Sequence, residues 1–210
     1  AKITSENEKM TAPLTIEGQK LHGIAYTLPV ASAQVKSALI LAGLYADGET
    51  RITEPEATRD HTEIMLNYLG ADIRKEGDTI VVRPAAELTG KDITVPGDIS
   101  SAAYFIAAAL ISKDSEVLIK NVGVNPTRTG IITAFKAMGG NIELTNERTV
   151  CGEPVADILV RSSRLHGVVI KGAIIPKLID EIPVIAAAAC YASGETVIAD
   201  AAELRVKESD

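Results

Sequence analysis

The sequence predicts a mixed α/β fold made of repeated β-α-β-α-β-β units, in which each unit contributes one buried Ala-rich helix. One order of features occurs three times: a Pro, a small polar cluster, an apolar Ala-rich helix and a short β-branched strand. The copies occupy residues 28–60, 95–119 and 174–198. Their spacing of roughly 67 and then about 80 residues is long for a solenoid repeat and suits a complete supersecondary unit. Three such units around a shared axis would bury the helices together and leave the sheets outside.

Composition and charge limit the function classes to which the chain can belong. Its 210 residues are 46% hydrophobic, enough for one large core or two modest ones. The formal net charge of -7 argues against a nucleic-acid backbone or an anionic membrane as the partner. Charged residues, Gly and Pro interrupt every apolar segment of helix length. The two cysteines, Cys151 and Cys190, form neither a disulfide framework nor a metal-binding spacing, so we expect a reduced, cytoplasmic protein.

The first unit opens with extended segments and a long apolar helix. The extended segments lie within residues 13–28, and the helix covers 33–46. This helix is apolar on nearly every face, so it should lie inside a domain and not on its surface. A short strand over residues 50–53 follows.

The second half of this unit begins with a capping signal. Asp60 and Glu63 have the form of a capping box. The helix that follows is amphipathic, and its apolar stripe consists of Ile64, Met65, Tyr68 and Leu69. Gly70 ends it, and residues 73–83 read as a hairpin with a Gly-Asp turn.

A linker-like stretch at residues 84–91 separates the two parts of the chain, which we expect to be 1–94 and 95–210. In the second part, Asn125 and Pro126 predict the cap and first turn of an amphipathic helix. Its apolar residues are Ile131, Ile132, Phe135 and Met138. A hairpin joined by the loop that holds Cys151 comes next, and a third unit begins at about residue 166 and is cut short.

Polar residues stand at the N-terminus of each Ala-rich helix: Ser32, residues 98–101 and residues 180–181. We expect catalytic or ligand-binding residues at these three helix N-termini. A helix N-terminus presents free backbone N–H groups and positive potential, and aligned helices would add these fields on one face of the domain. The expected ligand is a small polyanion, phosphorylated or carboxylated. Considered alone, Ser32 is more often a helix cap than a ligand contact.

Five segments of the chain read, in order, ASAQVKSA, EPEATRDHTEIMLNYLGA, VPGDISSAAYFIAAAL, KLIDEIPVIAAAA and LRVKESD. Together they resemble the 5-enolpyruvylshikimate-3-phosphate synthase family in its class II form, and the resemblance covers practically the whole chain. It implies an inside-out α/β barrel of the enolpyruvyl transferase type, with two domains of three units each. Residues 1–94 would be the latter part of the first domain, and residues 95–210 a truncated first part of the second.

The resemblance implies a transferase of the shikimate pathway of aromatic amino acid biosynthesis. It would move the enolpyruvyl group of phosphoenolpyruvate to the 5-hydroxyl of shikimate 3-phosphate and release phosphate. The partners would be these two small molecules, with no metal or organic cofactor, no nucleic acid and no membrane, and the full-length protein would be a monomer. The chain lacks an initiator Met, the family's glycine-rich N-terminal segment and the Arg residues beyond KESD. We therefore expect a fragment of a longer protein that is inactive alone.

The resemblance also assigns substrate contacts in the first part of the chain. Ser32, Ala33 and Gln34 would contact shikimate 3-phosphate, with Gln34 also near phosphoenolpyruvate. Arg59 would bind the 3-phosphate, because the guanidinium fork suits an oxyanion. Without the family, Arg59 is an exposed Arg beside a capping Asp.

Three catalytic residues are implied in the second part. Asp180 would be the general base at the 5-hydroxyl. Lys207 would neutralise phosphoenolpyruvate, and Glu208 would deliver and remove the proton at its methylene carbon. From the residues alone, Asp180 is a helix N-cap, and the Lys-Glu pair is solvated surface.

Two other functions stay open. A UDP-N-acetylglucosamine enolpyruvyl transferase is similar in fold and chemistry, but neither cysteine lies in the context of that family's reactive loop. A non-catalytic repeat module would bind a partner through its sheets and let Asp180, Lys207 and Glu208 diverge in space. The three histidines suggest neither a triad nor a metal site.

Overall fold

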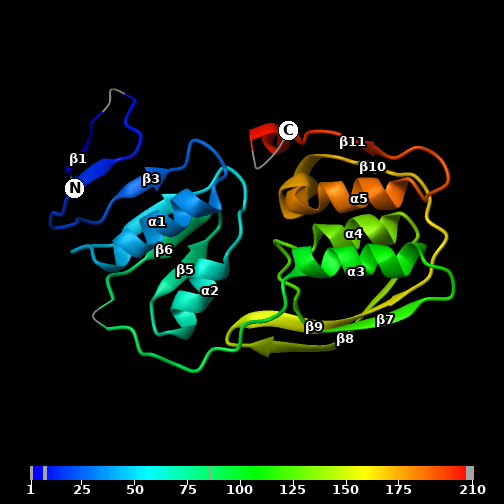
Figure 1. The fold of residues 1–210 in the computed structure, drawn as a ribbon. Coiled ribbons are helices and arrows are strands. Elements are labelled where there is room, and N and C mark those ends of the chain that lie inside the picture. Colours follow the sequence, from blue (N-terminus) through cyan, green and yellow to red (C-terminus); the bar gives the residue numbers. More distant parts are fainter. Residues whose placement is uncertain (1, 7–8, 86, 207–210) are drawn as a thin grey trace. The chain divides into compact units, whose positions relative to one another are not determined.

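The computed structural model of the chain describes residues 2–6, 9–85 and 87–206. The chain divides into two compact units, Ala1–Lys91 and Asp92–Asp210, which Figure 1 shows in sequence colours. This division and the domain boundary that we expect after residue 94 lie in the same connecting segment, between the last strand of the first unit and the first helix of the second.

The first unit is built on a four-stranded sheet with the order β3-β4-β6-β5. Along the chain its elements are β3 (Ala25–Thr27), α1 (Ala33–Leu44), β4 (Thr50–Thr53), α2 (His61–Tyr68), β5 (Ile73–Glu76) and β6 (Thr79–Val82). β3 and β4 are parallel, and the other neighbours are antiparallel. This order confirms the predicted β-α-β-α-β-β unit. The strands β1 (Lys2–Ser5) and β2 (Leu14–Glu17) form a separate antiparallel pair.

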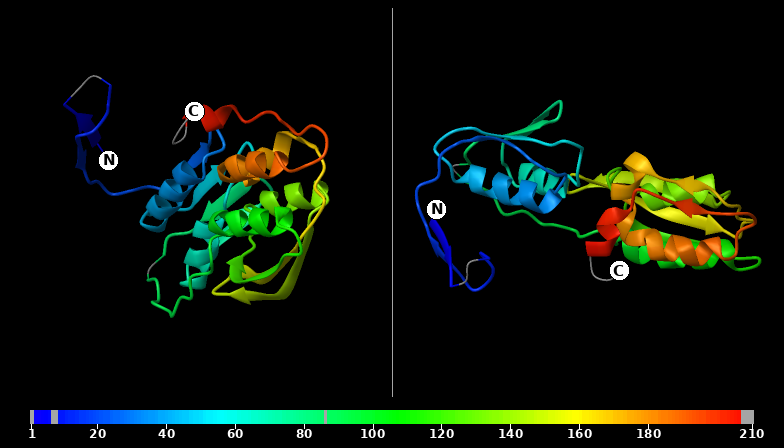
Figure 2. Two further views of the ribbon diagram at one scale, coloured as in Figure 1. Left: turned by 45° about the vertical axis from the view of Figure 1, so that its right-hand side comes forward. Right: turned by 90° about the horizontal axis from the view of Figure 1, so that it is seen from above.

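Both helices of this unit pack on one face of the sheet, as Figure 2 shows. The hydrophobic core between the two helices and the sheet consists of Leu28, Ile40, Leu44, Ile52, Leu66, Ile73, Ile80 and Val82. The predicted hairpin is confirmed, because Glu76 pairs with Thr79 across a two-residue turn. The first turn residue, Gly77, has φ 61°, a left-handed conformation that glycine adopts without strain.

The second unit combines three helices with a three-stranded antiparallel sheet. The helices are α3 (Ile99–Ile111), α4 (Gly130–Ala137) and α5 (Ile182–Ala189), and the sheet order is β7 (Glu116–Gly123), β9 (Glu153–Arg161), β8 (Asn141–Val150). A parallel pair, β10 (Val169–Ile170) and β11 (Val197–Ile198), and the 3-10 turns η1 (Gly172–Lys177), η2 (Ile179–Glu181) and η3 (Ala202–Val206) complete it. All three helices begin at the same end of this unit (Figure 1).

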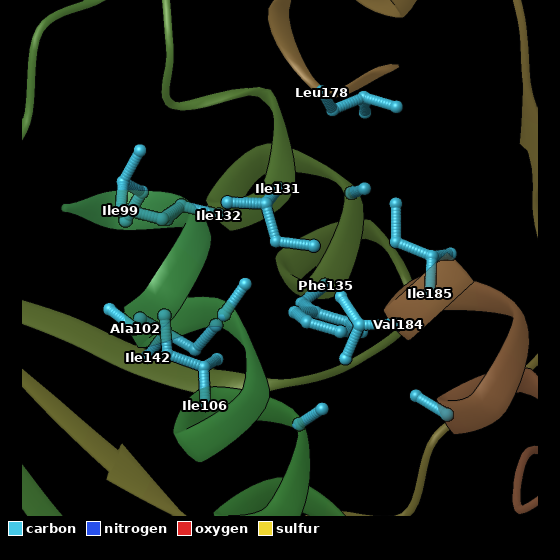
Figure 3. Close-up of a cluster of buried hydrophobic side chains, with 14 of the residues drawn as sticks. Ile99, Ala102, Ile106, Ile131, Ile132, Phe135, Ile142, Leu178, Val184 and Ile185 are labelled. Carbon is cyan, nitrogen blue, oxygen red and sulfur yellow. The ribbon is translucent and has the colours of Figure 1, made fainter. Parts of the chain in front are cut away.

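Apolar side chains from the three helices meet in the interior of this unit (Figure 3). Phe135 of α4 is completely buried there. The predicted apolar face of α4 is confirmed, since all four of its residues are buried: Ile131, Ile132, Phe135 and Met138.

The Ala-rich helices contribute buried residues to both cores, as expected, but the described residues show that they are not buried on every face. Val35 and Leu41 of α1 are 45% and 48% exposed, and Tyr104 and Phe105 of α3 are also exposed. α1 packs on β4, β6 and α2, and α3 packs on β7, β9 and α5, but apolar composition alone does not say whether anything covers the remaining face of each helix.

Three local expectations are also corrected. Asp60 makes no side-chain capping hydrogen bond, and Glu63 pairs with a buried Lys instead of closing a capping box. On α2 it is Leu66 that is buried, while Met65 is exposed. Asn125 accepts hydrogen bonds from Thr127 in a turn, and α4 begins only at Gly130. The carboxylate of Glu63 binds Lys36, and the amide oxygen of Asn125 accepts hydrogen bonds within a tight turn, so neither group caps a helix as the local sequence suggests.

Candidate active site

α1 begins at the polar opening that contains Ser32. The Ser32 backbone is extended, with φ -134° and ψ 108°, and its Oγ accepts a hydrogen bond from the Val35 backbone N–H at 3.3 Å. Ser32 is therefore the N-cap of α1, the role that a Ser most often has here. Ala33 and Gln34 follow in the first turn, where Gln34 is exposed.

Arg59 is half-buried in the segment between β4 and α2. This segment and the first turn of α2 contact the first half of α1: Ser37 Oγ lies 2.7 Å from Thr62 Oγ1, and Lys36 Nζ lies 2.7 Å from Glu63 Oε1. That Arg59 lies beside the N-cap of α1 remains a prediction. Lys36 was not predicted as a functional residue, although a single Lys within an apolar helix is a signal that points to it.

In the second unit, the beginnings of the three helices meet around Arg128, which lies in the turn before α4. Its Nη1 is 3.3 Å from Asp180 Oδ2, and its Nη2 is 3.5 Å from Glu181 Oε1. Nη2 also donates a hydrogen bond to Ser100 Oγ in the first turn of α3, and the Ser100 hydroxyl donates to Glu181 Oε1. Arg128 could not be found from local sequence signals, because its partners are far from it along the chain.

Asp180 is not the helix cap that its position in the sequence suggested. The N-cap residue of α5 is Glu181, which makes no side-chain capping hydrogen bond, and Asp180 belongs to the preceding turn η2. The two adjacent carboxylates differ in access to solvent. The Asp180 side chain is 34% exposed, whereas that of Glu181 is 2% exposed. Of this pair, Asp180 is the carboxylate that an external molecule can reach.

The pKa values of two carboxyls near Arg128 are shifted in opposite directions. Burial raises the pKa of Glu181, and the Ser100 hydrogen bond and the Arg128 charge only partly oppose it. At Asp98, the N-cap of α3, burial is outweighed by hydrogen bonds from Ser101 and Ser100 and by the charge of Arg128, so its pKa is lowered. This end of the unit thus holds a fixed cation among acids of different basicity.

Lys207 and Glu208 lie outside the described residues, so the convergence expected of them with Asp180 stays untested. Within residues 2–6, 9–85 and 87–206, no group of three or more His, Cys, Asp or Glu side chains is arranged to hold a metal ion. Among these same residues, no helix has both the length and the apolar character needed to cross a membrane.

Comparisons with known proteins agree on one family. The family EPSP synthase (3-phosphoshikimate 1-carboxyvinyltransferase) matches residues 1–210. A 3-phosphoshikimate 1-carboxyvinyltransferase of Desulforudis audaxviator is 60% identical over the whole chain, which covers 49% of that relative. One from Geobacter metallireducens is 63% identical over 199 residues, which are 95% of this chain and 46% of the relative. The chain thus spans about half the length of the curated relatives it matches.

Solved structures give the same result. The structure of EPSP synthase from Acinetobacter baumannii matches with a TM-score of 0.91 and 50% identity, over 100% of this chain and 47% of that one. The enolpyruvyl transferase NikO from Streptomyces tendae, at 20% identity, shares the fold with a TM-score of 0.68 over 88% of this chain and 45% of its own. With a family match over its whole length and relatives at 60% identity or more, the chain belongs to the EPSP synthase (3-phosphoshikimate 1-carboxyvinyltransferase) family.

Proposed function

We propose that this chain carries part of the active site of an enzyme that joins phosphoenolpyruvate to shikimate 3-phosphate. The 5-hydroxyl oxygen of shikimate 3-phosphate forms a bond to carbon 2 of phosphoenolpyruvate while its proton passes to a base, and carbon 3 takes up a proton as the carbon–carbon double bond opens. Loss of that proton from carbon 3 re-forms the double bond as the carbon–oxygen bond to the phosphate breaks, which releases inorganic phosphate and leaves the enolpyruvyl ether. Family membership and the name of the relative that is 60% identical support this reaction.

The arrangement at Asp180 is the observation that carries the proposal. A general base must be reachable by the hydroxyl and held in a fixed direction. Asp180 is partly exposed, and Arg128 donates to its Oδ2, whereas the neighbouring Glu181 is buried and already hydrogen-bonded. We assign the base to Asp180 and the holding contact to Arg128.

The remaining roles follow from the family resemblance. Ser32, Ala33 and Gln34 contact shikimate 3-phosphate, and Arg59 binds its 3-phosphate. Lys207 neutralises phosphoenolpyruvate, and Glu208 moves the proton at its methylene carbon. Residues 1–94 form the latter part of one domain and residues 95–210 the first part of another, in a cytoplasmic protein that is a monomer when full-length.

The test is acceptor-dependent release of phosphate from phosphoenolpyruvate by the protein as its gene encodes it. We expect release with shikimate 3-phosphate and none with UDP-N-acetylglucosamine, and no release by the 210 residues alone. Release with UDP-N-acetylglucosamine instead would favour the related transferase. No release with either acceptor would favour a binding module.

A further inference from the structure

Lys36 is buried in the first half of α1, although Lys is almost never buried unless it is paired. Its side chain is 1% exposed. The ammonium Nζ lies 3.3 Å from Glu54 Oε1 and 2.7 Å from Glu63 Oε1, and both carboxylates are largely removed from solvent. One cation on α1 therefore binds two acids that come from two other places in the unit.

The two acids bracket the segment that carries Arg59. Glu54 directly follows β4, and Glu63 lies in the first turn of α2. Glu54 Oε1, the oxygen nearest to Lys36, also accepts hydrogen bonds from the Thr58 backbone N–H at 3.2 Å and from Thr58 Oγ1. Thr58 immediately precedes Arg59. Both ends of the segment, and the residue before Arg59, are thus tied to one ammonium group.

Stability alone is a poor explanation for this network. One ammonium faces two carboxylates, so the network has an excess negative charge if all three groups are ionised. Glu63 Oε2 is buried with no hydrogen-bond partner among the described residues. Burying ions costs desolvation energy that apolar side chains of similar volume would not cost. What the network does provide is a fixed geometry between α1 and the segment 54–63.

We propose that Lys36 is a positioning residue for phosphate recognition. Through Glu54 and Thr58 it holds the backbone that carries Arg59 at the beginning of α1, where Ser32 caps the helix. This inference rests on the proposed function, in which Arg59 binds the 3-phosphate of the substrate. Lys36 itself does not contact the substrate.

The test compares binding of shikimate 3-phosphate with binding of shikimate, which lacks the phosphate. Calorimetry is carried out on the full protein and on its Lys36→Met, Arg59→Ala and double variants. We expect Lys36→Met to weaken binding of shikimate 3-phosphate by roughly 10–150-fold, the loss of one charge-assisted hydrogen bond, with shikimate affinity changed by no more than about 2-fold. When Arg59 is already Ala, Lys36→Met should add no more than about 2-fold, since both changes remove the same contact.

Lys75→Met is the matched control, because Lys75 is an exposed lysine of the same unit, on β5. It should leave both affinities unchanged. If Lys36→Met does not fold, Thr58→Val decides instead: it keeps the ion pairs, removes the hydroxyl contact to Glu54, and should produce a smaller loss that is again confined to the phosphorylated ligand.

Equal weakening of both ligands, or additive effects of Lys36→Met and Arg59→Ala, would show that Lys36 only supports the fold and would overturn the inference. These outcomes leave the proposed function intact, because the unsubstituted protein would still bind shikimate 3-phosphate. If the unsubstituted protein does not bind it, the proposed function fails first and this inference fails with it.

Discussion

Replacing Arg128 with Gln should destabilise the second unit, and the size of the effect should depend on pH. Arg128 lies within 3.5 Å of both Asp180 and Glu181. The contact to Asp180 is partly exposed and screened by solvent, so its loss costs about 1 kcal/mol at most. Removing the cation from the buried Glu181 leaves a charge without its partner, which costs about 3–5 kcal/mol. Because Ser100 still donates to Glu181, we expect the lower end, about 3 kcal/mol at pH 7.

The pH dependence follows from the raised pKa of Glu181. An acid whose pKa is higher in the folded state binds its proton more tightly there, so its ionised form destabilises the fold above that pKa. This destabilisation disappears as the pH falls from the raised value toward the ordinary value of 4.5. Loss of Arg128 raises the pKa of Glu181 further, and the variant should therefore recover part of its deficit at pH 5.

Hydrogen exchange of α3 and α5 peptides at pH 5 and pH 7 measures the opening free energy of this unit alone. Arg161→Gln is the control, since its ion pair with Glu116 lies in the same unit but is exposed, and its loss should cost less than about 1 kcal/mol. A cost below about 1 kcal/mol for Arg128→Gln, or an equal cost at both pH values, would refute the reasoning.

Three further changes test the rest of the account. Arg59→Ala in the full protein should raise KM for shikimate 3-phosphate by roughly 10–150-fold with kcat within a few-fold, because a phosphate contact is shared by ground and transition states; steady-state kinetics in which kcat falls instead would contradict it. Phe135→Ala should cost the second unit about 3–5 kcal/mol in urea unfolding, since the ring is completely buried, and a loss under about 1 kcal/mol would be incompatible with its place in the core. Gly130→Ala would bring a Cβ to 2.9 Å from both Leu178 Cβ and the Lys177 carbonyl carbon. We expect the free energy of unfolding of the second unit to fall by about 1–3 kcal/mol, and unchanged stability would mean that α4 and η1 are not in such close contact.

The order of elements was predictable because short β-branched strands, apolar helices and Gly or Pro breaks are local signals. Which face of each helix is buried was not predictable from such signals. The composition of α1 predicts an interior helix, yet Val35 and Leu41 are exposed while Lys36 is buried, because burial depends on which element packs on which face. Local rules also treat Glu63 as a capping residue, and only the fold reveals the ammonium that it binds.

In the candidate site, too, local roles could be predicted from the sequence and tertiary contacts could not. Ser32 as a helix cap follows from its place before an apolar helix, and the structure confirms this role. Asp180 has the same kind of position, but its observed partner is Arg128, which no spacing rule connects with it. Contacts between residues this far apart arise when three helix beginnings pack at one end of a unit, and a single sequence carries no local trace of such packing.

Asp180→Asn in the full protein tests most directly whether Asp180 acts on the reacting hydroxyl. The substitution keeps the size of the side chain and removes the basic oxygen. We expect kcat to fall by roughly 10²–10⁴-fold while the Kd for shikimate 3-phosphate changes by only a few-fold, since a general base contributes as the proton leaves. Near-normal turnover, or a loss of affinity as large as the loss of turnover, would contradict it.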